Sequence, residues 1–521
     1  MSSHGTDSNA LPSMRRAHAA DGRQISGALL SLLISMALMA VLWDRPINHD
    51  TAWYLLATRE WLAGERLYID IYEVNPPLNF YLTIPAILLA DLTGMSETNA
   101  QYAVTCFLTG ASLLWCTRLL VARNDLSSAR RTMFVLGLGT AMVLPALGDI
   151  AQREHVLVIV AMPWAIGLLP GTISDGWRPA ALRGAVAGLG ICLKPFFLLF
   201  PIAATLWAMA RSRSLSPTLS AGNIAMFGVG LTYVAAVWLL HPEYFRDIIP
   251  TARLVYGAIG ASDEVVYMML AVTAAPFVPL MLALSVARTY PPGTWLFFML
   301  ALAGLGSYLV QWTGFAYHLV PFKAFGMAAG FWILIHTTRF TPILIAALIA
   351  LLTTGYVAIS RGTYGVPIIA ELAEDLATLP HQESLFVAST FVHAGPPLAL
   401  SLGARWVSRY PHNWLTPGAL KALAETDCAR APDRCAQYRA ITDRNRDDNL
   451  ADILAAHPDL IVIDKRKGYM TDPDFSWHDY YDANPDWARI LRSYRQIRDT
   501  ESFDVWSRCA LDTATPGQDC R

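Results

Sequence analysis

The sequence predicts a polytopic α-helical membrane protein with about eleven transmembrane helices and an exported α/β domain at its C-terminal end. Hydrophobic residues make up 54% of the 521 residues and charged residues only 15%, whereas a soluble domain carries about 25% charged residues. Apolar runs long enough to cross a bilayer recur up to about residue 360 and then stop. This composition excludes a disordered chain, a fibrous protein and an ordinary cytosolic enzyme. A net charge of −2 gives no indication of nucleic-acid binding.

The first apolar run, Ile25–Trp43, follows a polar segment, residues 1–24, that contains three arginines. The run ends without a small-residue cleavage site, so we interpret it as a retained anchor helix. The arginines place the N-terminus in the cytoplasm. Glycines at four-residue spacing within later runs (Gly184 and Gly188, Gly326 and Gly330) predict close helix packing. The remaining predicted spans are residues 98–120, 132–147, 155–170, 183–193, 195–210, 221–240, 265–287, 294–311, 319–336 and 341–359.

Residues 78–93 are apolar but short and interrupted by proline, so we interpret them as a juxtamembrane segment rather than a span. With this choice every short arginine cluster of the loops falls in the cytoplasm, as the positive-inside rule requires. The predicted organisation is then a cytoplasmic tail (1–24), a transmembrane catalytic module (25–359) with a first exported loop (44–97), and a periplasmic domain (360–521). The protein is expected in the bacterial inner membrane.

The C-terminal region, residues 360–521, is predicted to be a small α/β domain. Ser384–Thr390 and Asp459–Asp464 resemble buried strands, and residues 494–507 a further strand pair. Four of the seven cysteines lie in this polar region, which allows one or two disulfides if it is exported. The spacing of the first two does not resemble a zinc site. The four are Cys428, Cys435, Cys509 and Cys520.

The first exported loop is rich in polar and aromatic residues. Residues 51–63 have helical spacing, with Trp53, Leu56 and Ala57 on one face, which predicts a helix lying on the membrane surface. Asp50 stands at its start. Either Asp50 caps the helix, or it is a general base at the membrane surface. Substrate contacts are predicted for four neighbours: His49, Tyr54, Glu73 and Asn75.

A second exported turn contains four ionisable residues: Asp149, Arg153, Glu154 and His155. Such a group at a helix mouth is costly unless it is paired or solvated. Asp149 and Arg153 are four residues apart and could form an interfacial salt bridge. The alternative is an anion or acceptor site, because arginine binds phosphate through two parallel hydrogen bonds.

Lys194 interrupts an apolar run, and His318 lies on the same predicted side of the membrane. The lysine either snorkels to the interface or is functional. We predict that Asp50, Asp149 and Lys194 converge on one extracytoplasmic cavity. There a carboxylate would deprotonate an acceptor hydroxyl while cations hold a phosphate whose charge grows as its bond to the sugar breaks. Because exported space lacks nucleotide sugars, the predicted donor is a polyprenyl-phosphate sugar.

These residues resemble the GT-C glycosyltransferases. The resemblance rests on the exported Asp50, the Gly-Glu-Arg-Leu-Tyr stretch at 64–68 and the Pro-Pro-Leu at 76–78 that begins an aromatic helix. It is to the protein O-mannosyltransferase and lipid A aminoarabinose transferase superfamily in particular. It covers residues 25 to about 200 by motif and residues 200–360 by topology.

The resemblance implies roles for individual residues. Asp50 corresponds to the carboxylate that activates the acceptor, and Asp149 or Glu154 to a second catalytic carboxylate. Lys194 falls where cations contact the donor phosphate, and three further phosphate contacts are implied: Arg153, His155 and His318. Relatives mostly invert the anomeric centre, so single displacement is expected. Members differ in their need for a divalent metal, which leaves a metal cofactor open, and no metal ligand is assigned.

One departure from the superfamily pattern lies just before the Pro-Pro pair. Many relatives have Lys or His-Lys there, whereas this chain has Glu73-Val74-Asn75. The resemblance therefore gives no support for a phosphate contact at this position.

The sequence thus predicts a membrane glycosyltransferase that moves a sugar from a polyprenyl-phosphate donor to a hydroxyl of an envelope glycan, lipid or protein. A polysaccharide polymerase is disfavoured because the longest internal exported loop is the first one. A lipid-linked glycan transporter or flippase is disfavoured because the ionisable residues lie at one face and no inverted repeat is visible. A non-catalytic envelope assembly protein is the remaining alternative. The sequence does not determine the sugar or the acceptor.

Overall fold

The computed structural model describes residues 27–123, 125–172, 176–258, 262–379, 382–467 and 474–509. The predicted cytoplasmic tail lies outside these residues. The chain divides into two compact units. The first contains Met1–Trp43, Tyr102–Tyr233 and Asp263–Gly362, and the second contains Asp44–Gln101, Val234–Ser262 and Thr363–Arg521.

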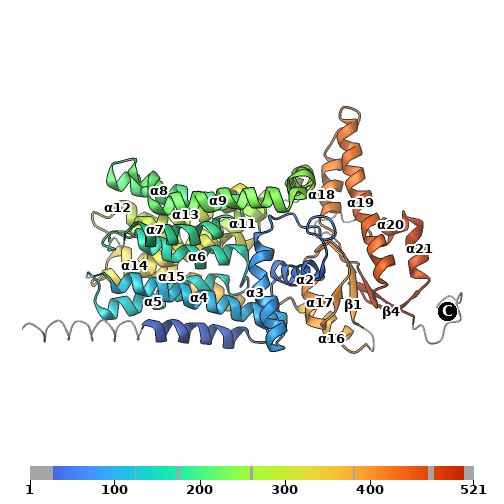
Figure 1. Cartoon of the computed structure of the whole chain (residues 1–521), viewed down its shortest axis with the longest axis horizontal. Coiled ribbons are helices and arrows are strands. Elements are labelled where there is room, and N and C mark those ends of the chain that lie inside the picture. The colour runs from blue at the N-terminus through green and yellow to red at the C-terminus, as the bar shows by residue number, and fades with distance from the viewer. Residues whose placement is uncertain are drawn as a thin grey trace, which may run out of the picture. The chain divides into compact units, whose positions relative to one another are not determined.

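The first unit is built from long apolar helices that run alongside one another (Figure 1). Within the described residues, every apolar run predicted up to residue 359 forms helix. Among the described residues seven helices are long and apolar enough to cross a membrane, and Gly27–Leu42 is shorter. The fold class is therefore confirmed, and the total of eleven spans stays a prediction. The seven are Glu97–Val121, Pro195–Ser212, Ala221–Leu240, Asp263–Val286, Thr294–Gln311, Ala316–His336 and Pro342–Arg361.

Three shorter helices complete this unit: α5 (Ser128–Val143), α6 (Arg153–Leu168) and α7 (Trp177–Ile191). The predicted glycine packing is confirmed. A Cβ on Gly184 would lie 2.1 Å from the backbone oxygen of Gly222 in α9 (Ala221–Leu240), so these two helices approach at backbone distance. A Cβ on Gly326 would lie 2.6 Å from the ring of Phe277. Small residues are what allow helices to approach this closely in a membrane.

The second unit contains a five-stranded sheet of order β2-β1-β3-β5-β4. β1 pairs in parallel with both β2 and β3, whereas β3 with β5 and β4 with β5 are antiparallel. The predicted α/β domain and its strands are confirmed, and the two-residue β2 was not predicted. The strands are β1 (Ser384–Ala388), β2 (Arg405–Trp406), β3 (Leu460–Asp464), β4 (Tyr494–Asp499) and β5 (Phe503–Arg508).

Alternate residues of the central strands feed two hydrophobic cores, because successive strand side chains point to opposite faces. Leu385 and Val387 share one core with residues of α2 (His49–Ala63) and α17 (Pro396–Leu402). Phe386 and Ile461 share the other with residues of α20 (Trp477–Asp482) and α21 (Pro485–Leu491). The remaining helices of this unit are α3 (Leu78–Thr93), α10 (Ile249–Val255), α16 (Pro367–Leu376), α18 (Leu415–Ala424) and α19 (Pro432–Ala456).

The predicted helix of the first exported loop is present as α2. Its predicted apolar face is covered by protein, and its place on the membrane surface stays a prediction. Trp53 and Ala57 are 4% and 2% exposed and lie in the core that α2 shares with the sheet. Residues 44–101 therefore fold together with the C-terminal region as one unit. Apolar spacing gives the buried face of a helix, but it does not say whether lipid or protein covers that face.

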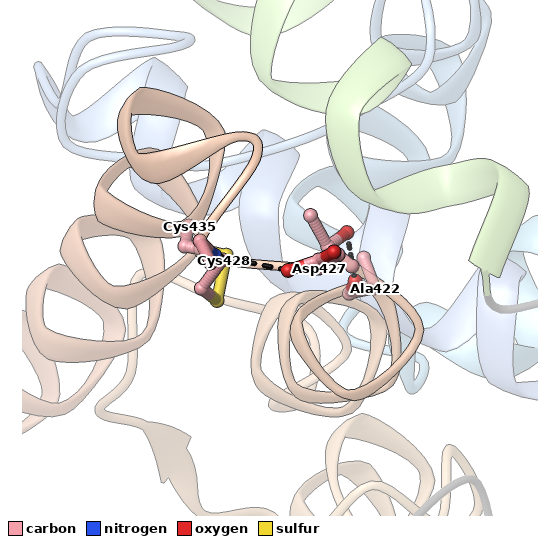
Figure 2. Close-up of a disulfide and its surroundings, with 6 residues drawn as sticks. Ala422, Asp427, Cys428 and Cys435 are labelled. Atoms are coloured by element: carbon pink, nitrogen blue, oxygen red, sulfur yellow. Dashed lines mark hydrogen bonds between the residues drawn. A yellow bond between two sulfur atoms is a disulfide. The ribbon is translucent and has the colours of Figure 1, made fainter.

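One disulfide, Cys428–Cys435, joins the turn after α18 to the first turn of α19, with Cα atoms 5.7 Å apart. Figure 2 shows the pair beside Asp427 and Ala422 at the end of α18. Thr426 Oγ1 donates a hydrogen bond of 2.6 Å to the Ala422 oxygen, which closes the end of α18. Cys509 is also disulfide-bonded, and Cys520 lies outside the described residues. Cys106, Cys116 and Cys192 are free.

The disulfide gives a test of the predicted periplasmic domain, because disulfides persist in exported and not in cytosolic space. We expect the Cys428 and Cys435 thiols of spheroplasts to react with a membrane-impermeant maleimide only after reduction. Mass spectrometry of the α18–α19 peptide would measure the label. Cys428→Ser/Cys435→Ser is the control that should remove it. Labelling only after permeabilisation would place this domain in the cytoplasm, and labelling of intact spheroplasts without reduction would contradict the disulfide.

Candidate functional site

The start of α6 gathers ionisable side chains of the first unit. Gln152 is the N-cap, and Arg153, Glu154 and His155 form the first turn. All four are buried, with exposures of 4% or less. The Ala151 N–H donates to His155 Nδ1 at 3.1 Å, so this ring nitrogen holds the turn in place. Asp149 lies partly exposed in the same turn, where its carbonyl accepts from the Gln152 N–H.

Lys194 lies at the centre of a buried polar cluster. Its Nζ donates to Glu154 Oε1 at 2.6 Å, to Gln311 Oε1 at 3.2 Å and to His318 Nε2 at 3.0 Å. An ammonium has three hydrogens and no acceptor. His318 Nε2 must therefore accept, which leaves the imidazole proton on Nδ1, 3.0 Å from Thr313 Oγ1. Glu154, Lys194, Gln311 and His318 each lie where a helix starts or ends. The backbone of Lys194 is extended before Pro195.

This cluster bears on the snorkelling interpretation of Lys194, whereas its functional role stays a prediction. The side chain is 5% exposed and ion-paired, so it does not snorkel to an interface. It also brings together three of the residues predicted from sequence: Glu154, Lys194 and His318. Glu154 is fully buried, and its second oxygen, Oε2, has no hydrogen-bond partner within the described ranges. The same holds for both polar atoms of the Gln152 side chain.

Asp50 lies in the second unit, in the first turn of α2. The N-cap of α2 is Asn48, whose side-chain oxygen accepts from the Thr51 N–H at 3.0 Å. The interpretation of Asp50 as the cap is therefore wrong. The Asp50 carboxylate instead lies 3.4 Å from His49 Nε2, with a quarter of its side chain exposed.

Three residues that the sequence did not single out surround His49 and Asp50. The His393 ring lies edge-on to the His49 ring, with centroids 5.0 Å apart. His393 Nδ1 is 2.5 Å from the Tyr364 hydroxyl. Burial and the neighbouring His49 lower the pKa of His393 to about 3, and the same two causes lower the pKa of His412 to about 3. Both rings are thus neutral at physiological pH.

The other predicted substrate contacts support the local structure around α2. Glu73 Oε2 accepts from Trp53 Nε1 at 2.7 Å, and Glu73 Oε1 accepts from the Asn75 N–H at 2.7 Å. Tyr54 is 2% exposed and lies edge-on to Phe80, with centroids 5.0 Å apart. The acidic residue that stands in place of the relatives' lysine therefore joins α2 to the turn before α3. A substrate role for Tyr54, Glu73 and Asn75 stays a prediction.

The assignment of the cap can be tested by stability. Asn48→Ala should lower the unfolding free energy by about 1 kcal/mol, the usual contribution of an N-cap side chain. Asp50→Asn keeps that cap and should lower it less. Thermal unfolding in detergent would rank the two variants. A larger loss for Asp50→Asn than for Asn48→Ala would return the capping role to Asp50.

The predicted residues thus fall into two groups, one in each unit. Glu154, Lys194 and His318 contact one another in the first, and His49 contacts Asp50 in the second. The convergence of Asp50, Asp149 and Lys194 stays a prediction. Among the described residues no three His, Cys, Asp or Glu side chains are grouped so that they could hold a metal ion.

Comparison with known proteins gives a structural likeness and no match by sequence. No family model matches the chain, and no curated protein matches it. The structure is similar to ArnT from Cupriavidus metallidurans bound to undecaprenyl phosphate, with a TM-score of 0.50 and 14% identity over 94% of this chain and 98% of that chain. The apo state of that protein gives a TM-score of 0.49 with the same identity and coverage. ArnT is a lipid A aminoarabinose transferase, a GT-C enzyme. At this identity the likeness shows the fold alone: the chain shares the fold of ArnT, as the resemblance inferred from the sequence predicted.

Proposed function

We propose that the protein is a GT-C-type membrane glycosyltransferase of the bacterial inner membrane that uses a polyprenyl-phosphate sugar as donor. The fold likeness extends over nearly the whole of both chains, and the solved relative holds undecaprenyl phosphate. Because one fold can serve several functions, the proposal also needs support from the residues themselves.

The start of α6 carries that support. A helix N-terminus favours an anion, because unpaired N–H groups and the helix dipole point toward it. There the Gln152 side chain, 2% exposed, has no hydrogen-bond partner for either polar atom within the described ranges. Such buried atoms are normally satisfied. Arg153 and Lys194 add two buried cations beside the Glu154 carboxylate. A phosphate there would accept a hydrogen bond from Gln152 Nε2.

In the proposed reaction Asp50 acts as general base. Its carboxylate takes the proton of the acceptor hydroxyl as the acceptor oxygen attacks the anomeric carbon. The bond from that carbon to the phosphate oxygen breaks, and the polyprenyl phosphate leaves with the electron pair. Arg153 and Lys194 stabilise the charge that the leaving phosphate gains. One displacement of this kind inverts the anomeric centre.

A panel of radiolabelled undecaprenyl-phosphate sugars and envelope acceptors, incubated with the purified protein, tests the proposal. We expect transfer from at least one donor. Failure of every donor, together with flipping of the lipid-linked sugar in liposomes, would instead support a transporter. Failure of both activities would leave the non-catalytic alternative.

Binding of undecaprenyl phosphate tests the α6 site separately, with native mass spectrometry as the measurement. Gln152→Leu should weaken binding severalfold, because it removes the amide while keeping the apolar volume. Gln496→Leu, on exposed β4, is the matched control and should bind as wild type does. Equal binding by both variants would remove the start of α6 from the donor site.

A further inference from the structure

The parallel part of the sheet has a topological switch point. From β1 the chain passes through α17 to β2 on one side, and later returns to β3 on the other side of β1. In open α/β sheets, ligands bind outside the carboxyl ends of the strands at such a point. Residues 389–395 leave β1 there and run to α17, while Lys465 and Arg466 follow β3.

The loop after β1 brings His393 against the start of α2. The edge-on contact with His49 and the hydrogen bond with Tyr364 fix the His393 ring on two sides. His49 in turn lies 3.4 Å from the Asp50 carboxylate. A chain of contacts therefore runs from Tyr364 through His393 and His49 to Asp50, all within the second unit.

The charges of this group are unsuited to an anion. His393 and His412 are held neutral by burial and by His49. Arg466, which follows β3, is a cation that acts on His393. It donates two hydrogen bonds to Asp464, at 2.9 and 2.7 Å. Its guanidinium also lies over the rings of Phe391 and Phe503, at 4.1 and 4.8 Å. The charged members of the group are Arg466, Asp464, Asp50 and, when protonated, His49. Together they carry no net positive charge, whether or not His49 is protonated.

We propose that the switch point beside Asp50 receives an uncharged, hydroxyl-bearing acceptor such as a glycan, and that His393 is a positioning residue that orients His49 and Asp50 toward it. This rests on the proposed function, since the acceptor is that of the proposed transfer. Neutral imidazoles, a tyrosine hydroxyl and a carboxylate offer both hydrogen-bond donors and acceptors. A phosphate at this place would be repelled by the Asp50 carboxylate, and Arg466 is already paired with Asp464. The C-terminal domain thereby supplies part of the acceptor site.

Carbethoxylation by diethyl pyrocarbonate, followed residue by residue with mass spectrometry, tests the positioning role without an activity assay. His393→Ala should raise the modification rate of His49 severalfold, because the ring that covers one edge of His49 is removed. His393→Asn keeps an acceptor for the Tyr364 hydroxyl and should restore part of the protection. His457→Asn is the matched control, since Asn tolerates the left-handed backbone of that C-cap (φ 46°). An unchanged His49 rate in His393→Ala, in protein that still unfolds cooperatively, would overturn the positioning role.

The acceptor class is tested by protection of His393 and His49 with two probes at matched ionic strength, methyl glucoside and glucose 1-phosphate. We expect the neutral glycoside to slow modification and the phosphate to have little effect. Stronger protection by glucose 1-phosphate, or protection by neither probe, would overturn the hydroxyl site. If the donor panel shows no transfer while methyl glucoside still protects, the proposed enzyme fails and the glycan site stands. In an active protein, His393→Ala should raise the KM for acceptor more than it lowers kcat, whereas a fold defect would lower both the amount and the activity of the protein.

Discussion

Asp50→Asn should reduce sugar transfer by about 100- to 10,000-fold, the range that general-base catalysis contributes. The amide cannot take the acceptor proton, yet it keeps the size of the carboxylate and leaves the Asn48 cap of α2 in place. Initial rates with the active donor of the panel measure the effect. Binding of undecaprenyl phosphate should persist, because the side chains assigned to phosphate are those at the start of α6.

Asp91→Asn is the matched control for this prediction. Asp91 lies in the same unit, is 55% exposed and forms a surface ion pair with Arg59, so its loss should leave transfer close to wild type. Full activity in Asp50→Asn would exclude the general-base role. Loss of both activity and folding in Asp50→Asn would show that Asp50 is needed for structure, which the cap assignment does not predict.

Lys194→Met should be the most destabilising of these substitutions. It leaves the Glu154 carboxylate fully buried without its cation, and removing one partner of a buried ion pair typically costs about 3–5 kcal/mol. It also removes the donor to Gln311 and His318. Thermal unfolding in detergent should show a large fall in the midpoint. Lys421→Met, on an exposed position of α18, is the control and should unfold near wild type.

The double variant Lys194→Met/Glu154→Leu separates stability from function. Replacing a whole buried pair by apolar residues is often neutral or stabilising, so the double variant should regain much of the lost midpoint. If Lys194 holds the donor phosphate, sugar transfer stays lost in that stable protein. Recovery of both stability and transfer would show that the cluster only holds the helices together. A single Lys194→Met variant as stable as wild type would contradict the ion pair itself.

Much of the fold could be predicted because its signals are local. Apolar length predicts the helices between residues 25 and 359, and short β-branched runs such as Leu460–Asp464 predict strands. Local signals fail where two neighbouring residues could both fill the same structural role. An aspartate at the start of a helix is a common cap, yet Asn48, two residues earlier, has the required extended backbone and makes the bond. Strand β2, at two residues, is too short to show any alternation.

The sequence by itself determined that the chain crosses a membrane, that it ends in an α/β domain, and that Glu154, Lys194 and His318 are unusual enough to matter, because charged groups in apolar surroundings are costly wherever they lie. Only the tertiary structure decided what those groups contact. Lys194 meets Glu154 and His318 across 40 and 124 positions of chain, and His393 reaches His49 from the C-terminal part of the chain. A lone histidine or tyrosine has no pattern along the chain that names its partner. Its partner is set by packing, which joins segments according to the burial of whole helix and sheet faces rather than the identity of one polar residue.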